Sequence, residues 1–78
     1  MTARDEILAA ATTITGGRKQ ATFTVEQVID ELRRAGSRYA VSTIRTHVTS
    51  RMCANAPDNH AVTYDDFLRT DVGTYRLA

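Results

Sequence analysis

The chain has a single cysteine, Cys53, in 78 residues, so it cannot form an internal disulfide. A chain of this length therefore depends on one packed core, because small domains bury only about 60% of the surface that the unfolded chain exposes. The sequence predicts one domain over residues 1–78.

A lone cysteine fits a reducing compartment. The start of the chain lacks a secretory leader, and no apolar run approaches the roughly 20 residues that span a bilayer. We therefore expect a cytoplasmic protein with no membrane contact.

The clearest helix start lies near residue 24. Thr24 and Gln27 have the spacing of a capping box, and Phe23 can pack on Val28 as a hydrophobic staple. Gly36 suits the left-handed position that ends a helix. The residues expected to face the core from this helix are Val25, Val28, Ile29 and Leu32.

An earlier helix and a late hairpin complete the expected elements. Thr2 can cap the first helix, and Gly16-Gly17 stops it. The buried stripe of this helix is expected to be Ile7, Leu8, Ala11 and Ile14. Residues 21–23 can form a short strand that a later strand covers. Residues 67–70 and 74–77 flank a turn in which Gly73 takes a positive φ, which predicts a terminal hairpin.

A third helix is expected to begin near Val41. Its apolar stripe is narrow and consists of Val41, Ile44, Val48 and Met52. The residues around that stripe are small or basic: Ser42, Thr43, Arg45, Thr46, Thr49, Ser50 and Arg51. Ser and Thr are mediocre helix formers, and an ordinary surface helix carries Glu and Lys instead. A face of short hydroxyls and Arg without carboxylates suits close approach to a polyanion.

The charge is unevenly distributed along the chain. The net charge is −2 over residues 1–31, +5 over residues 32–57 and −2 over residues 58–78, and every charged residue of the middle segment is Arg. Arg matches phosphate oxygens and guanine edges better than Lys does. A solvated helix face is the alternative explanation of this charge.

The order helix, short strand, capped helix, turn, Ser/Thr/Arg helix and hairpin resembles the winged helix-turn-helix family. The resemblance covers nearly the whole chain and is carried by Phe23-Thr24-Val25, Ser42-Thr43-Ile44-Arg45 and Gly73-Thr74-Tyr75-Arg76-Leu77. It implies an α+β fold with three helices, a small antiparallel sheet and a C-terminal hairpin wing. It also implies sequence-specific binding of double-stranded DNA by a transcriptional regulator of bacterial or phage type, with the third helix in the major groove.

The family's contacts can be transferred to residues of this sequence. The resemblance assigns base contacts to Ser42, Thr43, Arg45, Thr46, Thr49 and Ser50. It assigns phosphate contacts to Thr22, Thr24, Arg38, Tyr39 and Arg51, and wing contacts to Arg69 and Arg76. At 100° per residue, Thr43, Thr46 and Ser50 point most directly away from the apolar stripe. Two features depart from the family: the turn before the third helix is long, and Asp71 lies near the wing tip, where a minor-groove contact favours Arg.

Other functions are weaker matches to the sequence. A homodimer through the first helix is expected, because one small domain covers only a short half-site. The alternatives are a winged helix used as a protein-interaction module and a DNA-recognition subunit of a larger complex. Catalysis is not expected, because Ser50 and His47 lack an orienting acid. The spacing of His47, Cys53 and His60 fits no common zinc site, and neither a cofactor nor a small-molecule ligand is indicated.

Overall fold

The computed structural model describes residues 2–55 and 64–78, and these form an α+β fold. Three helical segments precede a C-terminal hairpin, in the order that the sequence predicts. The elements are α1 (Ala3–Thr15), β1 (Thr22–Thr24), α2 (Val25–Arg34), α3 (Val41–Thr46) continued by η1 (His47–Arg51), β2 (Phe67–Asp71) and β3 (Thr74–Leu77). The predicted loop at residues 55–59, apart from Asn55, and His60 lie outside the described residues. In the part of the chain that is described, no helix is long and apolar enough to cross a membrane.

The predicted ends of α2 are confirmed. The backbone N–H of Gln27 donates to Oγ1 of Thr24 at 3.2 Å, and the backbone N–H of Thr24 donates to Oε1 of Gln27 at 2.8 Å. Gly36 has a φ of +81°, and the next N–H, of Ser37, donates to the carbonyl of Leu32 at 2.9 Å. These bonds satisfy backbone groups that the helix itself leaves without partners.

Thr2 caps α1 as expected, and Asp5 completes a second capping box. The N–H of Asp5 donates to Oγ1 of Thr2 at 3.2 Å, and the N–H of Thr2 donates to Oδ2 of Asp5 at 3.2 Å. The helix ends at Gly16, which has a left-handed φ of 67°. Asp5 also places negative charge in the first turn, where it favours the positive end of the helix dipole.

The sheet is antiparallel with the strand order β1-β3-β2. Phe23 of β1 lies opposite Tyr75 of β3, so β3 covers the short strand as expected. Phe67 lies opposite Leu77 in the hairpin, where Gly73 has a φ of +71°. The ring centroids of Phe23 and Phe67 are 4.9 Å apart in an edge-to-face contact, which joins β1 to the hairpin across the core.

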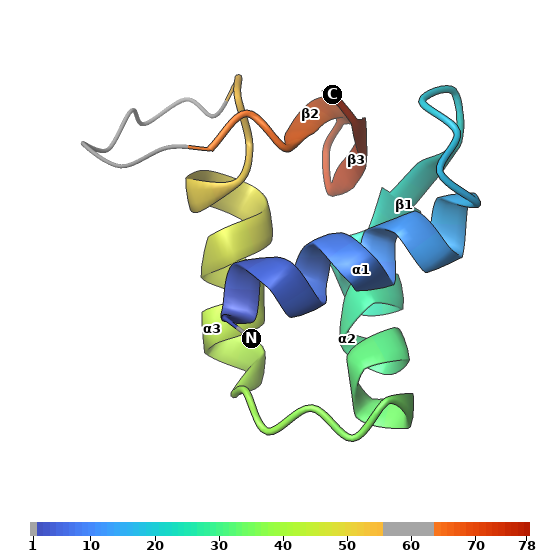
Figure 1. Ribbon diagram of the computed structural model, residues 1–78. Coiled ribbons are helices and arrows are strands. Elements are labelled where there is room, and N and C mark those ends of the chain that lie inside the picture. Colours follow the sequence, from blue (N-terminus) through green and yellow to red (C-terminus); the bar gives the residue numbers. More distant parts are fainter. Residues whose placement is uncertain (1, 56–63) are drawn as a thin grey trace.

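The three helical segments pack around one core, with the sheet at one end. Figure 1 shows α1 crossing α2 and α3, while the sheet lies at the end opposite the loop that joins α2 to α3. The largest fully buried side chains are Phe23, Phe67, Ile7, Met52, Val28, Val48, Thr15 and Cys53. The fully buried set thus draws on α1, α2 and η1, and α3 adds Ile44 to the core, at 3% exposed.

The third helical segment differs from the prediction in two respects. It begins at Val41 as expected, but residues His47–Arg51 form a π-helix instead of continuing the α-helix. The hydroxyl of Thr49 donates to the carbonyl of Arg45 at 2.7 Å, and the N–H of Met52 donates to the carbonyl of His47 at 2.8 Å. A side chain that takes up a carbonyl of the helix ladder disturbs regular α-helical bonding. The second difference is Val41, which is 37% exposed and does not belong to the buried stripe.

Candidate nucleic-acid interface

The outward side of α3 and η1 carries hydroxyl and cationic groups. Five residues line a shallow hollow of about 270 Å³ there, and we call them the outer face: Ser42, Thr43, Thr46, His47 and Arg51. Neither α3 nor η1 contains an acidic residue. Short side chains let a ligand approach the helix closely, and the guanidinium of Arg51 offers donors to an anion.

The structure brings together only part of the predicted base-contact set. Ser42, Thr43 and Thr46 meet at the outer face. Thr49 and Ser50 lie in the wide turn of η1, where both are partly buried. The predicted orientation of Ser50 assumed 100° per residue, and the π-helical turn does not follow that spacing. Neither Thr49 nor Ser50 lines the outer face.

Arg45 lies on the side of α3 that faces α2. Its Nη1 is 3.9 Å from Oε2 of Glu26, and the two side chains are 52% and 69% exposed. Glu26 is in the first turn of α2 and brings a carboxylate to the edge of a helix that has none of its own. Arg45 therefore lies beside the outer face and not within it, as its position next to the apolar stripe predicts.

Three titratable side chains, Cys53, Glu26 and Arg69, act electrostatically on the phenol of Tyr75. Burial raises the pKa of Tyr75. The electrostatic effects of Cys53 and Glu26 also raise this pKa, whereas Arg69 lowers it. Arg69 is opposite Tyr75 in the hairpin, so both side chains lie on the same side of the sheet. One of the two predicted wing residues, Arg69, is thus on the side of the hairpin that faces the helices, near the start of α2.

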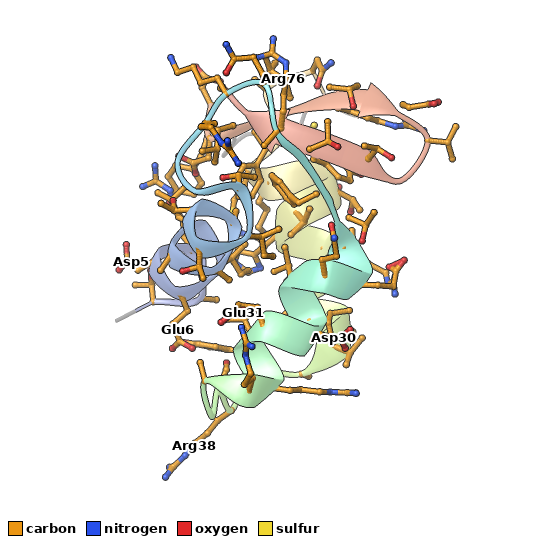
Figure 2. All side chains as sticks on the ribbon, turned by 90° about the vertical axis from the view of Figure 1, so that its right-hand side faces the viewer. Asp5, Glu6, Asp30, Glu31, Arg38 and Arg76 are labelled. Atoms are coloured by element: carbon orange, nitrogen blue, oxygen red, sulfur yellow. The ribbon has the colours of Figure 1, made fainter. Side chains whose placement is uncertain are left out.

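The predicted phosphate contacts are spread over the molecule. Figure 2 shows Arg38 and Arg76 at opposite ends of it, Arg38 on the loop between α2 and α3 and Arg76 on the sheet. Thr22 is opposite Arg76, and the hydroxyl of Thr24 already caps α2. Tyr39 is 37% exposed in the loop before α3. Among these residues and Arg51, only Arg51 lines the outer face.

The hairpin is fastened to the end of η1 by its backbone and by Asn55. The N–H of Arg69 donates to Oδ1 of Asn55 at 2.8 Å, and Nδ2 of Asn55 donates to the carbonyl of Arg69 at 3.1 Å. The N–H of Phe67 donates to the carbonyl of Met52 at 2.8 Å. These bonds hold β2 against the chain that leaves η1.

A second contact fastens the segment before β2 to α1. The guanidinium of Arg4 donates to both carboxylate oxygens of Asp66, from Nε at 2.8 Å and from Nη2 at 3.0 Å. It also lies 3.9 Å from the ring centroid of Tyr64. Asp66 therefore serves as an ion-pair partner of α1.

Acidic side chains collect on the other side of the molecule, between α1 and α2. Glu6 and Glu31 line a groove of about 410 Å³, together with small side chains such as Ala9. Figure 2 shows Glu6 and Glu31 on neighbouring helices at this groove. Arg34 forms an ion pair with Glu31. The acidic groove and the outer face thus have different charge and lie on different elements.

His47 and Glu26 lie beside the proposed contacts, although neither was predicted from the sequence to make one. His47 follows Thr43 by four residues, a spacing that places both on one helical side and was the available signal. Glu26 had no such signal, because its partner belongs to another helix. Within residues 2–55 and 64–78, no three His, Cys, Asp or Glu side chains are close enough together to hold a metal ion.

The fold and the outer face define a small α+β domain with one hydroxyl- and Arg-lined helix. The chain belongs to a family described as a domain of unknown function (DUF7669), which it matches over residues 4–77. No curated protein matches the chain, and no solved structure does.

Proposed function

We propose that the domain is a winged helix that binds double-stranded DNA sequence-specifically and acts as a transcriptional regulator. In this proposal α3 and η1 enter the major groove, and the β2–β3 hairpin is the wing. The observation that carries the proposal is the outer face, where three hydroxyl side chains, His47 and Arg51 surround one hollow.

The distribution of charge supports this orientation on DNA. The element proposed to enter the groove has no carboxylate, whereas Glu6 and Glu31 line the groove between α1 and α2. A polyanion attracts the first surface and repels the second, so the charges orient the domain during its approach. Arg38 and Arg45 add cationic groups before and within α3.

The placement of the hairpin supports its proposed role as the wing. Figure 2 shows it extending away from α1, and the bonds of Asn55 and Met52 keep it beside η1. Its tip carries Val72, which is 82% exposed, next to Asp71. A tip without a cation contributes little phosphate attraction, so we assign most of the affinity to α3, η1 and the loop before them.

A protein-interaction module is the second candidate function, and the groove between α1 and α2 favours it. The mouth of this groove carries Glu6 and Glu31, while Ala9 and Ala35 leave room for close approach. The expected homodimer through α1 would bring these like charges together unless basic residues of the second copy face them. Sedimentation of the free protein and of its DNA complex tests the dimer, and a single protomer in both excludes it.

A titration of labelled duplex with the protein at two salt concentrations tests DNA binding. We expect binding that weakens as salt rises, because each neutralised phosphate contributes about −0.9 to the slope of log K against log salt. Selection from a random duplex library then gives the preferred site. Affinity that stays at background at both salt concentrations excludes this function and leaves the interaction module.

A further inference from the structure

The imidazole of His47 is held in one tautomer by the helix itself. Its Nδ1 is 2.7 Å from the carbonyl oxygen of Thr43. A carbonyl oxygen only accepts hydrogen bonds, so Nδ1 carries the proton and donates it. In the neutral ring the other nitrogen, Nε2, is then an acceptor.

This acceptor belongs to a side chain of the outer face. Among the described residues, Nε2 has no hydrogen-bond partner, and no side-chain nitrogen or oxygen is both buried and unpaired. Nε2 is therefore not fully buried, and His47 lines the hollow together with Thr46 and Arg51. Bonding of Nδ1 to the backbone limits rotation of the ring, so the position of Nε2 is fixed before any ligand arrives.

The chemistry of Nε2 complements that of its neighbours. Arg51 can only donate, and the hydroxyls of Ser42, Thr43 and Thr46 can do either. His47 in this tautomer adds the one group of the outer face that only accepts. In the major groove the matching donors are the exocyclic amino groups of adenine N6 and cytosine N4, whereas guanine offers only acceptors there.

We propose that Nε2 of His47 accepts a hydrogen bond from the amino group of one adenine or cytosine in the major groove. The inference rests on the proposed DNA-binding function and names one base contact within it. Every base pair carries one such amino group, on one of its two strands. His47 therefore distinguishes the two orientations of a pair.

Two substitutions of His47 distinguish the role of Nδ1 from the role of Nε2. His47→Asn places an amide N–H near the position of Nδ1, so it preserves the donor to the Thr43 carbonyl but removes the acceptor at Nε2. His47→Gln extends an amide toward the position of Nε2 and retains an acceptor there. Thermal unfolding of each variant checks that the fold is unchanged.

The test scans the preferred site with duplexes in which one base at a time lacks its exocyclic amino group. We expect the wild-type protein to lose roughly 2- to 10-fold in affinity at one position, the value of one hydrogen bond. His47→Asn should show no loss of affinity when the amino group is removed at that position, while its losses at all other positions match those of the wild type. His47→Gln should still lose affinity at that position. A His47→Asn profile identical to wild type overturns the inference.

The proposed function and the His47 contact are overturned by different results. A wild-type protein that binds no duplex overturns the proposed function and this inference with it. A sequence-specific protein whose His47→Asn variant keeps every sensitivity overturns the inference alone. The tautomer is tested without DNA: we expect ring nitrogen–proton correlation spectra to give the Nδ1–H form, and a dominant Nε2–H form removes the premise.

Discussion

Nη1 of Arg45 lies 3.9 Å from Oε2 of Glu26, so the edge of the proposed DNA-binding surface carries a carboxylate that belongs to a different helix. The two side chains are largely exposed, and an exposed pair of this kind contributes little to folding. Its effect falls instead on any anion that approaches Arg45, because the carboxylate repels that anion and competes for the guanidinium.

Glu26→Gln should therefore strengthen DNA binding by about two- to fivefold, in line with the modest energy of exposed charge pairs. The gain should shrink at high salt, which screens exposed charges. Titration of one duplex with both proteins measures it. Glu6→Gln is the matched control, because it makes the same change of charge at the α1–α2 groove. An equal gain from both variants would mean that only net charge matters.

Arg45 and Arg38 should differ in what they contribute to binding. Arg45→Ala is expected to weaken binding to the preferred site by about 1–3 kcal/mol and to relax preference at one base pair. Arg38→Ala should weaken specific and random DNA alike and reduce the salt slope by about one unit. Affinity measurements on both kinds of duplex at several salt concentrations separate the two effects. If neither substitution changes affinity, DNA does not bind through α3.

The buried side of the third helical segment can be tested by paired substitutions. Val48 is fully buried, so Val48→Asp places a carboxylate without a partner in the core and should unfold a domain whose stability is on the order of 5 kcal/mol. Thr46→Asp, on the exposed side, should stay folded and lose DNA binding through repulsion of phosphate. Circular dichroism monitors folding. Two equally folded variants would contradict the assignment of the buried side.

The cap of α1 predicts a dependence of stability on pH. The backbone hydrogen bond from Thr2, followed by its side-chain hydrogen bond, lowers the pKa of Asp5. A carboxyl with a lowered pKa in the folded state stabilises the protein above its unfolded pKa, and this contribution is lost as pH falls through the folded pKa. Asp5→Ala should thus lower the melting temperature near neutral pH and have less effect at about pH 2, where more of the wild-type carboxyl is protonated.

Asp65→Ala is the comparison for that measurement, since Asp65 is exposed and lies outside the helices. It should leave the melting temperature nearly unchanged at both pH values. A loss of stability in Asp5→Ala that is the same at both pH values would show that the helix cap does not depend on the charge of the carboxylate.

Features set by neighbouring residues could be predicted from the sequence. The cap formed by Thr24 and Gln27, the helix end at Gly36 and the hairpin turn at Gly73 depend on contacts within a few residues, and each was predicted. The start of α3 at Val41 was also predicted from the change in residue pattern. Local chemistry leaves few alternatives at such positions.

Features that depend on distant or competing partners could not be predicted. The segment His47–Arg51 is π-helical, and a helical period read from apolar residues assumes regular α-helical spacing and does not report this change. The ion pair of Arg4 with Asp66 joins residues 62 positions apart. Likewise, the contact of Glu26 with Arg45 depends on how two helices pack, which sequence spacing does not define.

The side chain of Asn55 has a mechanical consequence, because it bonds to both backbone groups of Arg69 and so imitates an additional strand residue. These bonds link the hairpin to the chain that leaves η1, so they restrain its movement relative to η1. Under the proposed function, the spacing between the hairpin and η1 is therefore restrained, and the duplex must deform where its grooves do not match that spacing. Sites whose grooves already have the matching spacing are then favoured over sites that must bend to reach it.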